Sequence, residues 1–511
     1  MTSPPRSEPP RAWTSPPRRE KLRELFGVDL RSLALFRVAL GVSLLVDLAM
    51  RARDLTAHYT DQGILPRALL LPFGRLAIPL HRLNGGAAYE AALFIVAALV
   101  ATALTAGYKT RAATIVSWLL LQSLHERNRL ILDGGDPLLR IMLFWSMFVP
   151  LGARFSLDSF GARRARAVAR GATSLSEGQR LASFATAALL VQIASMYLFT
   201  GLLKLEFPVW PRGTALRYAL LAYHMTTPLG TALLAYPGLL FALGMSVLVW
   251  EIIGPLLWFS PWRTGPVRTF TTAGFLVLQI GIAACMTIGN FQPSAMVLVL
   301  PFLPAWFWDD LLPRLSITRF SRAVGQPQET PRASSRAARA LDVTALVLAV
   351  YILACNVGTL FVKRDLPGRP ERLAYLLGID QRWDMFGGPR RPTGYTVVAG
   401  KLADGTEVDL LHGGLHGDQV SWDKPDDPAD IYANWRWRRY MIWYVWTPRG
   451  EPYRPAFAAY LCRTWSRAHP EEKRALSVEM TWVRQVTEVD FTLRAPERVL
   501  VYQGACPREG T

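Results

Sequence analysis

The sequence predicts a polytopic α-helical membrane protein with about nine transmembrane helices, followed by a small α+β domain outside the membrane. Three observations predict this fold class. Hydrophobic residues make up 51% of the 511 residues. Apolar stretches of ~20 residues, long enough to cross a bilayer, recur between about residue 32 and about residue 362. Short alternating segments replace them afterwards. We therefore divide the chain into a tail (1–31), a membrane domain (32–362) and an outer domain (363–511).

The tail differs from a signal peptide. Residues 1–25, MTSPPRSEPPRAWTSPPRREKLREL, are rich in Pro and Arg and contain no apolar segment that a signal peptidase substrate would need. They predict a disordered cytoplasmic tail, so the first span serves as the insertion signal. The expected spans lie near 32–50, 88–107, 112–125, 138–152, 182–204, 234–259, 268–288, 293–310 and 343–362.

The net charge of +18, from 57 Lys and Arg against 39 Asp and Glu, is unevenly distributed. Residues 363–511 carry 22 basic and 20 acidic residues, so the basic excess lies in the membrane part, mainly in loops. This pattern favours the positive-inside rule over a nucleic-acid partner. The basic loops at 161–180 and 321–340 then face the cytoplasm, with an inside N-terminus and an outside C-terminus. The 51–87 loop is an Arg-rich exception, and its segment ALLLPFGRLAIPL (68–80) suits an interfacial helix.

The outer domain shows the signals of an α+β fold. GYTVVAGKLADGTEVDLL (394–411) alternates like two strands around Ala-Asp-Gly, which predicts a hairpin. RWRRYMIWYVW (436–446) and ERVLVYQGA (497–505) also predict strands. PAFAAYLCRTWSRAH (455–469) has helical spacing.

The four cysteines fit this division of the chain. Cys285 and Cys355 fall within expected spans, where a thiol serves as a small apolar side chain. Cys462 and Cys506 lie in the outer domain, where an oxidising compartment permits a disulfide. Cysteine and histidine residues show no zinc-ligand spacing, so we expect no metal site.

Lys204 stands near the end of the apolar run YLFTGLLKLEFPVW (197–210), about where hydrocarbon gives way to headgroups. Glu206, Pro208 and Trp210 follow it within two turns. Two interpretations stay open. Lys204 is either an anchor whose ammonium reaches water beside an interfacial Trp, or a base, because desolvation lowers the pKa of an amine.

A second polar set lies in SLHERNRLILDGGDPLLR (123–140), between two expected spans. Charges at membrane depth cost ~2.5–3.5 kcal/mol each, so they are usually paired or line a wet cavity. By the expected topology this set shares the outer membrane boundary with Lys204. We therefore predict that Lys204 contacts residues 125–136 in one polar cavity. The set comprises His125, Glu126, Arg127, Asn128, Arg129, Asp133, Asp136 and Arg140.

Structural ion pairs are the alternative interpretation of these charges. Arg127 with Asp136, or Glu126 with Arg129, would close the loop without any chemical role. Arg37 in the first span and Glu251 in the sixth are single charges, which pair with each other or with other neighbours.

Five segments carry a resemblance to a known family. TGLLKLEFPVWPRGTAL (200–216) resembles the lysine segment of the vitamin K-dependent γ-carboxylase-like membrane family, also called the HTTM (horizontally transferred transmembrane) domain family. SLHERNRLILDGGDPLLRIMLFWSMFVPLG (123–152) resembles the family's Arg-Asn and Gly-Gly-Asp loop. ALFRVALGVSLLVDL (34–48) and YTDQGILP (59–66) resemble its first span and first outer loop. QRWDMFGGPRRPTGYTVVAGKLADGTEVDLL (381–411) resembles the Trp-x-Met-Phe segment of many bacterial members.

The resemblance implies a multi-helix fold in a bacterial inner (cell) membrane, with an active cavity on the outer side. In the carboxylase, the residue matching Lys204 deprotonates vitamin K hydroquinone, and the oxygenated quinol yields an alkoxide base. The alkoxide removes a γ-proton from a peptide Glu, and the carbanion captures CO2. Asn128 matches an active-site Asn. The family follows that Asn with a His, whereas this chain has Arg129, and the outer domain is shorter than the carboxylase's substrate-binding domains.

Two functions from different classes follow. The first is a carboxylase-like lyase that uses a reduced quinone (vitamin K hydroquinone-like) and no metal, with Lys204 as base. The second is a non-catalytic membrane scaffold or assembly factor whose outer domain binds an exported protein or peptide. The lipid bilayer is a partner in both, and a transporter lacks the expected inverted repeat. The first function predicts a quinone pocket formed by Asn128, Arg127, Trp210, Glu126 and Asp136.

Overall fold

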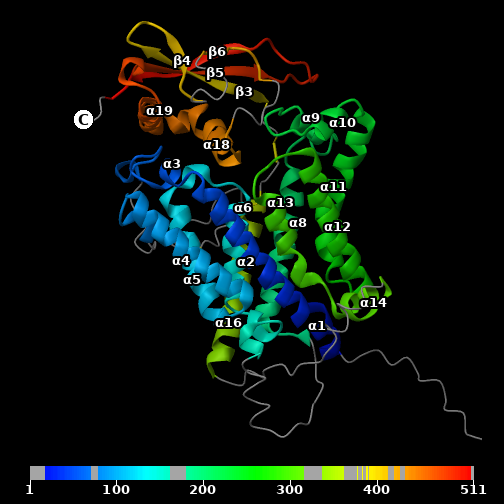
Figure 1. Cartoon of the computed structure of the whole chain (residues 1–511). Coiled ribbons are helices and arrows are strands. Elements are labelled where there is room, and N and C mark those ends of the chain that lie inside the picture. Colours follow the sequence, from blue (N-terminus) through cyan, green and yellow to red (C-terminus); the bar gives the residue numbers. More distant parts are fainter. Residues whose placement is uncertain are drawn as a thin grey trace, which may run out of the picture.

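The computed structural model describes residues 18–70, 79–160, 180–315, 336–361, 391–411, 419–425 and 432–507, together with residues 377, 383, 387 and 388. Helices form a bundle, and the C-terminal domain lies on one end of it, which we call the domain end (Figure 1). The opposite end carries α1 (Arg18–Phe26) and α14 (Leu312–Arg314), and we call it the far end.

Six helices among the described residues are long and apolar enough to cross a membrane. A pair of segments bent by 92°, Phe291–Phe302 and Phe307–Arg314, makes a seventh candidate if it counts as one span. These lengths match the ~20 residues that cross a hydrocarbon core, so the chain is a multi-pass membrane protein. The six helices are α2 (Leu30–Ala52), α4 (Ala87–Ala106), α8 (Phe184–Lys204), α11 (Pro237–Leu257), α12 (Thr264–Cys285) and α16 (Arg336–Phe361).

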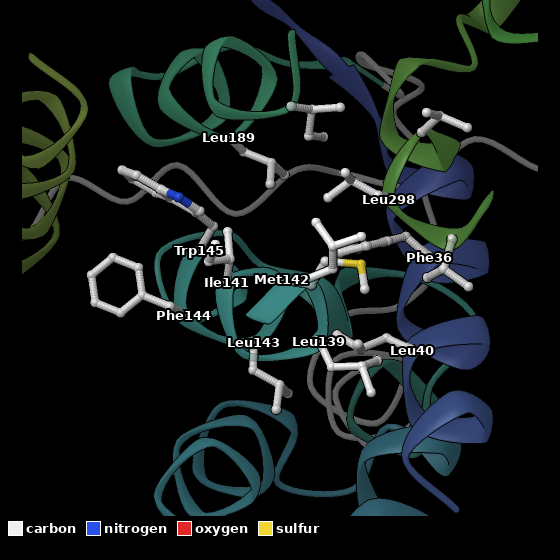
Figure 2. Packing of buried hydrophobic residues seen from close by; sticks show 14 of the residues in the cluster. Phe36, Leu40, Leu139, Ile141, Met142, Leu143, Phe144, Trp145, Leu189 and Leu298 are labelled. Carbon is white, nitrogen blue, oxygen red and sulfur yellow. The ribbon is translucent and has the colours of Figure 1, made fainter. Parts of the chain in front are cut away.

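A short helix, α6 (Gly135–Ser146), occupies the centre of the bundle. Its side chains interdigitate with Phe36 and Leu40 of α2, with Leu189 of α8 and with Leu298 of α13 (Phe291–Leu298), as Figure 2 shows. Because other helices surround it, α6 is buried on nearly every face. A helix of this length measures only ~18 Å, less than the bilayer core.

The prediction of about nine spans is not confirmed, since six or seven helices of the described chain qualify. The expected span at 138–152 corresponds to α6, which is apolar because protein surrounds it. The expected span at 112–125 corresponds to α5 (Thr110–Arg127), whose last turns are polar and buried. Sequence hydropathy measures apolar length, and it does not tell whether lipid or protein covers that length.

The far end is ordered by contacts that involve the expected tail. Residues 18–26 form α1, and β1 (Val28–Asp29) pairs antiparallel with β2 (Arg180–Leu181). Asp29 caps α2, because its side chain accepts a hydrogen bond from the Arg31 amide at 2.8 Å. The expectation of disorder over 1–31 is therefore wrong from residue 18 onward, and residues 1–17 lie outside the described residues.

The C-terminal domain is a four-stranded antiparallel sheet with helices on the face that looks toward the bundle (Figure 1). The strand order is β4-β3-β5-β6. Cys462 of α19 and Cys506, just after β6, form a disulfide with a Cα–Cα distance of 5.7 Å. The elements are β3 (Pro392–Leu402), β4 (Glu407–Asp409), α18 (Trp435–Tyr440), α19 (Arg454–Ala468), β5 (Ala475–Val486) and β6 (Glu497–Ala505).

Most of the secondary structure expected for this domain is present. The hairpin at 394–411, the strand at 497–505 and the helix at 455–469 correspond to β3–β4, β6 and α19. The strand expected at 436–446 is wrong, because this segment forms α18 and a π-helical turn at Met441–Val445.

The physical reason lies in the burial pattern of α18. Arg436, Trp437, Tyr440 and Met441 are buried, which is the spacing of one helical face. Asn434 caps the helix by accepting hydrogen bonds from the Arg436 and Trp437 amides. Aromatic residues mixed with Arg fit a strand pattern equally well, so the sequence alone favoured the wrong period.

Short elements connect the long helices. Residues 71–78, 161–179 and 321–335, which include most of the expected interfacial helix and of the two basic loops, lie outside the described residues. The short helices and 3-10 turns are α3 (Leu55–Tyr59), Arg67–Leu69, Leu80–Arg82, Arg129–Ile131, Leu151–Ala153, α9 (Ala215–Leu220), α10 (Pro228–Leu233), Leu300–Phe302, Pro448–Tyr453 and Glu471–Lys473, with a π-helical turn at Phe307–Leu311.

Candidate functional site

Lys204 ends α8 inside the protein. Only 2% of the residue is exposed. Its Nζ donates a hydrogen bond to the carboxylate of Glu251 in α11, which is also buried. The ring centroid of Trp210 lies 4.6 Å from the ammonium nitrogen. Lys204 therefore has a carboxylate on one side and an aromatic face on the other, and it does not reach out of the protein.

The close approach of α8 and α11 makes this pair possible. Gly201 lies one turn before Lys204, and a Cβ at this position would come within 2.9 Å of Ile252 and 3.1 Å of Glu251. A larger residue would push the two helices apart. Glycine at this position therefore brings the backbone of α8 near enough for the pair to form.

Gly387, one of the few described residues between α16 and β3, contacts the segment that follows Lys204. The Trp210 indole N–H donates to the carbonyl oxygen of Gly387 at 3.1 Å. Gly387 also packs on Phe207, because a Cβ there would lie 2.3 Å from the Phe207 ring. Trp383, four residues earlier, is only 4% exposed. Of these aromatic side chains, Trp210 lies against the buried amine, and Phe207 packs in the same cluster as Trp210.

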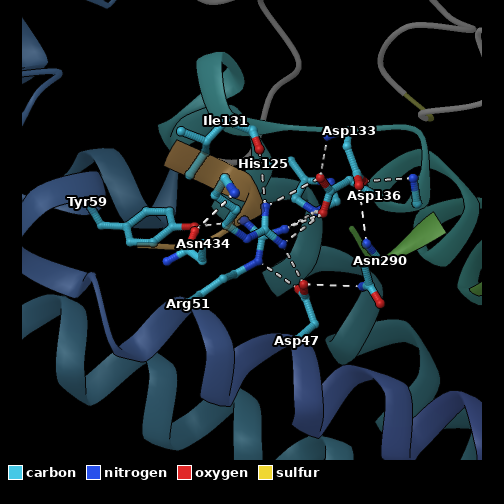
Figure 3. Close-up of polar contacts among 11 residues, drawn as sticks. Asp47, Arg51, Tyr59, His125, Ile131, Asp133, Asp136, Asn290 and Asn434 are labelled. Carbon is cyan, nitrogen blue, oxygen red and sulfur yellow. Dashed lines mark hydrogen bonds and ion pairs between the residues drawn. The ribbon is translucent and has the colours of Figure 1, made fainter. Parts of the chain in front are cut away.

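A larger group of buried charges lies where the bundle meets the C-terminal domain, and we call it the charge network (Figure 3). Arg51 of α2 donates to Asp47 at 2.7 Å and to the Tyr59 hydroxyl at 2.7 Å, and it also bonds Asp136. Its Nη2 lies 3.2 Å from the Nε2 atom of His125. All these side chains are almost fully buried.

Arg436 brings the C-terminal domain into the charge network. Its guanidinium donates to Asp47 at 2.6 Å and to Asp136 at 3.3 Å and 3.4 Å. It also donates to the Ile131 carbonyl oxygen at 3.3 Å. Two arginines therefore face two carboxylates, which balances the buried charge and satisfies most lone pairs.

Neighbouring polar contacts extend this junction. Asp54 accepts from Asn434 Nδ2 at 2.6 Å and from the Trp437 indole N–H at 3.0 Å. Trp437 packs against the His58 ring, with centroids 4.7 Å apart. Burial, followed by the charges of Arg436 and Arg51, lowers the pKa of His58 to about 3, so this imidazole stays neutral.

Asp133 belongs to the same loop but titrates differently. Burial, followed by the charge of Asp136, raises the pKa of Asp133 to about 7. Its carboxyl accepts from the Gly135 amide at 2.8 Å and from the Asn290 amide at 3.2 Å. Near neutral pH this group therefore exchanges a proton, although it sits among groups that keep fixed charges.

The structure does not bring the expected quinone-pocket residues together, because their contacts are to different partners. Trp210 lies with Lys204, whereas Asp136 lies in the charge network. Asn128 donates to the His58 carbonyl oxygen at 2.9 Å, and Arg127 donates to the Leu65 carbonyl oxygen at 2.8 Å. The remaining member, Glu126, pairs with Arg129.

The expected contact between Lys204 and residues 125–136 does not occur among the described hydrogen bonds and ion pairs. Lys204 forms an ion pair with Glu251 instead, so the partner of Glu251 is Lys204 and not Arg37. Arg37 donates to backbone carbonyl oxygens, those of Leu151 and Arg154 at 3.1 Å and that of Phe155. Of the two proposed loop pairs, Glu126 with Arg129 forms, and Arg127 approaches Asp61 at 3.8 Å instead of Asp136.

Sequence patterns did not indicate three charged members of the charge network: Asp47, Arg51 and Arg436. A signal was present for the first two, since an Asp and an Arg four residues apart at the end of an apolar helix form an (i, i+4) pair. Arg436 carried no comparable signal, because its partners Asp136 and Asp47 are 300 and 389 positions away in the sequence.

Comparison with known proteins gave no match to a family model, to a curated protein or to a solved structure.

Proposed function

We propose that this chain is a membrane-embedded enzyme in which Lys204 removes a proton from a quinol, with Glu251 receiving the excess proton. One observation carries the proposal: a lysine at the end of a membrane helix is buried in the protein and paired with one carboxylate. An anchoring lysine would extend its ammonium to headgroups or water. Fully buried lysines are rare unless paired, and a buried charge within a membrane helix is a functional-site hypothesis.

The pair suits proton transfer for a physical reason. In a dry site both charged forms lose hydration, so passing a proton from the ammonium to the carboxylate costs less than in water. The resulting neutral amine has a free lone pair. When it takes a proton from a substrate hydroxyl, the O–H bond breaks, an N–H bond forms, and the charge that remains on oxygen lies beside the ammonium.

The surroundings of Lys204 fit a quinol in chemical terms. A quinol supplies a phenolic hydroxyl of moderate acidity and, once deprotonated, gives up electrons, for which dioxygen is the acceptor in this proposal. Trp210, beside the Lys204 ammonium, and Phe207, which packs in the same cluster as Trp210, offer aromatic faces on which a flat ring stacks. The resemblance of residues 200–216 and 381–411 to the carboxylase-like family points to the same cofactor class.

A test compares bound quinone and proton abstraction in matched variants. We expect that lipid extraction of the purified wild-type protein releases quinone. Lys204→Arg should reduce the rate of quinol-dependent turnover ~100-fold or more. Arg keeps the charge but cannot act as a base, because it stays protonated. Lys401→Arg, which changes an exposed lysine in β3, is the matched control and keeps full turnover. A folded wild-type protein that neither carries nor oxidises any quinol would overturn the proposal.

A second candidate function, a scaffold for an exported protein or peptide, is favoured by a different observation. β6 is the edge of the described sheet, and Leu500 on it is 55% exposed. An open edge can pair with an extended segment of another chain. Under this function, cross-linking from β6 would capture a partner, and Lys204→Arg would leave that capture unchanged.

A further inference from the structure

We infer that the far end of the bundle holds a binding site for an anionic phosphate group, such as that of an acidic phospholipid. A pocket of about 360 Å³ opens there, within the ~300–1,000 Å³ range of ligand pockets. It lies between α1, the β1–β2 pair, the beginning of α12 and the bend before α14. The lining residues are Glu24, Gly27, Asp29, Arg180, Arg263, Thr264, Gly265, Pro266, Arg268, Pro304, Ala305 and Trp306.

Arg268 is the observation that points to a ligand. It lines the pocket although only 2% of the residue is exposed. Its Nη1 donates to the carbonyl oxygens of Glu24 and Gly27, both at 3.2 Å. Its Nε and Nη2 atoms have no hydrogen-bond partner among the described residues. A buried guanidinium with unused donors attracts an anion more strongly than an exposed one does, because water screens it less.

The first turn of α12 adds backbone donors to the same pocket. Thr264, Gly265 and Pro266 line it. The amides of Thr264 and Gly265 are donors with no partner within the helix, whereas Pro266 has no N–H to donate. The side chain of Arg263 does not cap this helix. Because α12 is 22 residues long, its positive end adds to the attraction for an anion.

The charges around the pocket are net positive. Arg180 and Arg263 are exposed at its rim, and Arg268 lies within it. Asp29 does not offset them, since it accepts two hydrogen bonds from the Arg31 guanidinium at 2.9 Å and 2.8 Å. Glu24 is the remaining carboxylate at the pocket. An anion that neutralises part of this positive charge is therefore bound favourably.

The phosphate group has two sources that differ in how they enter the pocket. A phospholipid headgroup enters from the bilayer, and Trp306 at the lining suits the membrane–water boundary. A free phosphate ion enters from the aqueous side and needs no acyl chain. Both sources use the same donors, namely the three arginines and the first amides of α12.

Binding of short-chain lipids to the full-length protein in detergent tests this site. We expect dioctanoyl phosphatidylglycerol to bind at least tenfold more tightly than dioctanoyl phosphatidylcholine, measured by native mass spectrometry and thermophoresis. Arg268→Gln should reduce that affinity at least tenfold. Arg263→Gln, which changes an exposed side chain and leaves the fold intact, should reduce it severalfold. The matched control is Arg111→Gln, an exposed arginine at the beginning of α5, which should leave it unchanged.

Inorganic phosphate is the second probe. Phosphate that competes with the lipid at similar concentration supports the site and identifies free phosphate as a sufficient ligand. Lipid binding that phosphate does not displace supports the site with a headgroup as ligand, provided that Arg263→Gln weakens it. Equal binding of the two lipids, or equal weakening by Arg111→Gln and Arg263→Gln, would overturn the inference, because acyl chains or total charge would then explain the binding.

Discussion

The Lys204–Glu251 pair and the charge network are both buried at the domain end, but they are built differently. In the network, Asp136 accepts from two arginines and from the Asp133 amide, and Asp47 accepts from both arginines. In the pair, one ammonium meets one carboxylate among the described residues. An ammonium has three donors. The network is thus nearly saturated, whereas the pair has unused hydrogen-bonding capacity.

This difference suggests different roles. A saturated network fixes geometry, since any one contact is held by several others. It also joins segments far apart in sequence, the α2 and α6 helices of the bundle and α18 of the C-terminal domain. An unsaturated pair in a dry place is poorly explained by stability, because apolar residues of similar volume often stabilise a protein as well or better. The network thus joins the C-terminal domain to the bundle, and the proposed function gives the pair a chemical role that the following variants test.

Removing one member of the network should have the largest effect on stability. Arg436→Met leaves the Asp47 and Asp136 carboxylates without one of their two arginines, and breaking a buried pair in this way costs ~3–5 kcal/mol. We expect a strong loss of thermal stability and faster proteolysis of the C-terminal domain. Arg449→Ala, at an exposed position of the same domain, should change stability by less than ~0.5 kcal/mol. Similar behaviour of the two variants would refute domain attachment by Arg436.

Removing the disulfide should destabilise the C-terminal domain, which contributes Arg436 to the charge network, by less than Arg436→Met does. Replacing Cys462 and Cys506 together by Ser should cost ~2–4 kcal/mol in the C-terminal domain, because the reduced chain is less constrained when unfolded. The α18 contacts should loosen first, while the Lys204–Glu251 pair remains. Hydrogen exchange measured by mass spectrometry checks this, with α18 and α8 as the two peptides to compare. Equal deprotection of both peptides would mean that the two sites form one cooperative unit.

Titration of Asp133 should sharpen the comparison further. Its pKa is raised to about 7, so its contribution to stability is fully present below the unfolded value of 3.8 and is lost as pH rises through about 7. His58 acts in the opposite sense, because its lowered pKa costs stability as pH falls below 6.5. The difference between wild type and Asp133→Asn therefore isolates Asp133. We expect that unfolding midpoints between pH 4 and pH 8 fall with pH more steeply in wild type than in the variant.

The sequence predicted the apolar helices of the bundle, the α+β nature of the C-terminal domain and the position of Lys204 at the end of a membrane helix. Each of these depends on local patterns, such as the apolar run before Lys204 or the alternation at 497–505. What it missed depends on contacts between distant segments. Glu251 is 47 positions from Lys204, and Arg436 is 389 positions from Asp47. No periodicity reports such neighbours, so the expected cavity joining Lys204 to 125–136 was assembled from topology alone.

Replacing both members of the Lys204–Glu251 pair should have the smallest effect on stability and the largest effect on turnover. In Lys204→Met with Glu251→Leu, two apolar side chains of similar size replace the pair, and such exchanges of a buried ion pair are neutral or stabilising by ~1–4 kcal/mol. Lys204→Met alone should instead destabilise the protein, because Glu251 keeps a buried, unpaired charge. We therefore expect a double variant with wild-type thermal stability but no quinol-dependent turnover. If the double variant is as unstable as Arg436→Met, the pair has the same structural role as the network. If it is stable and still turns over quinol, Lys204 is not the base. The double variant thus separates the two sites by measuring stability and turnover in one protein.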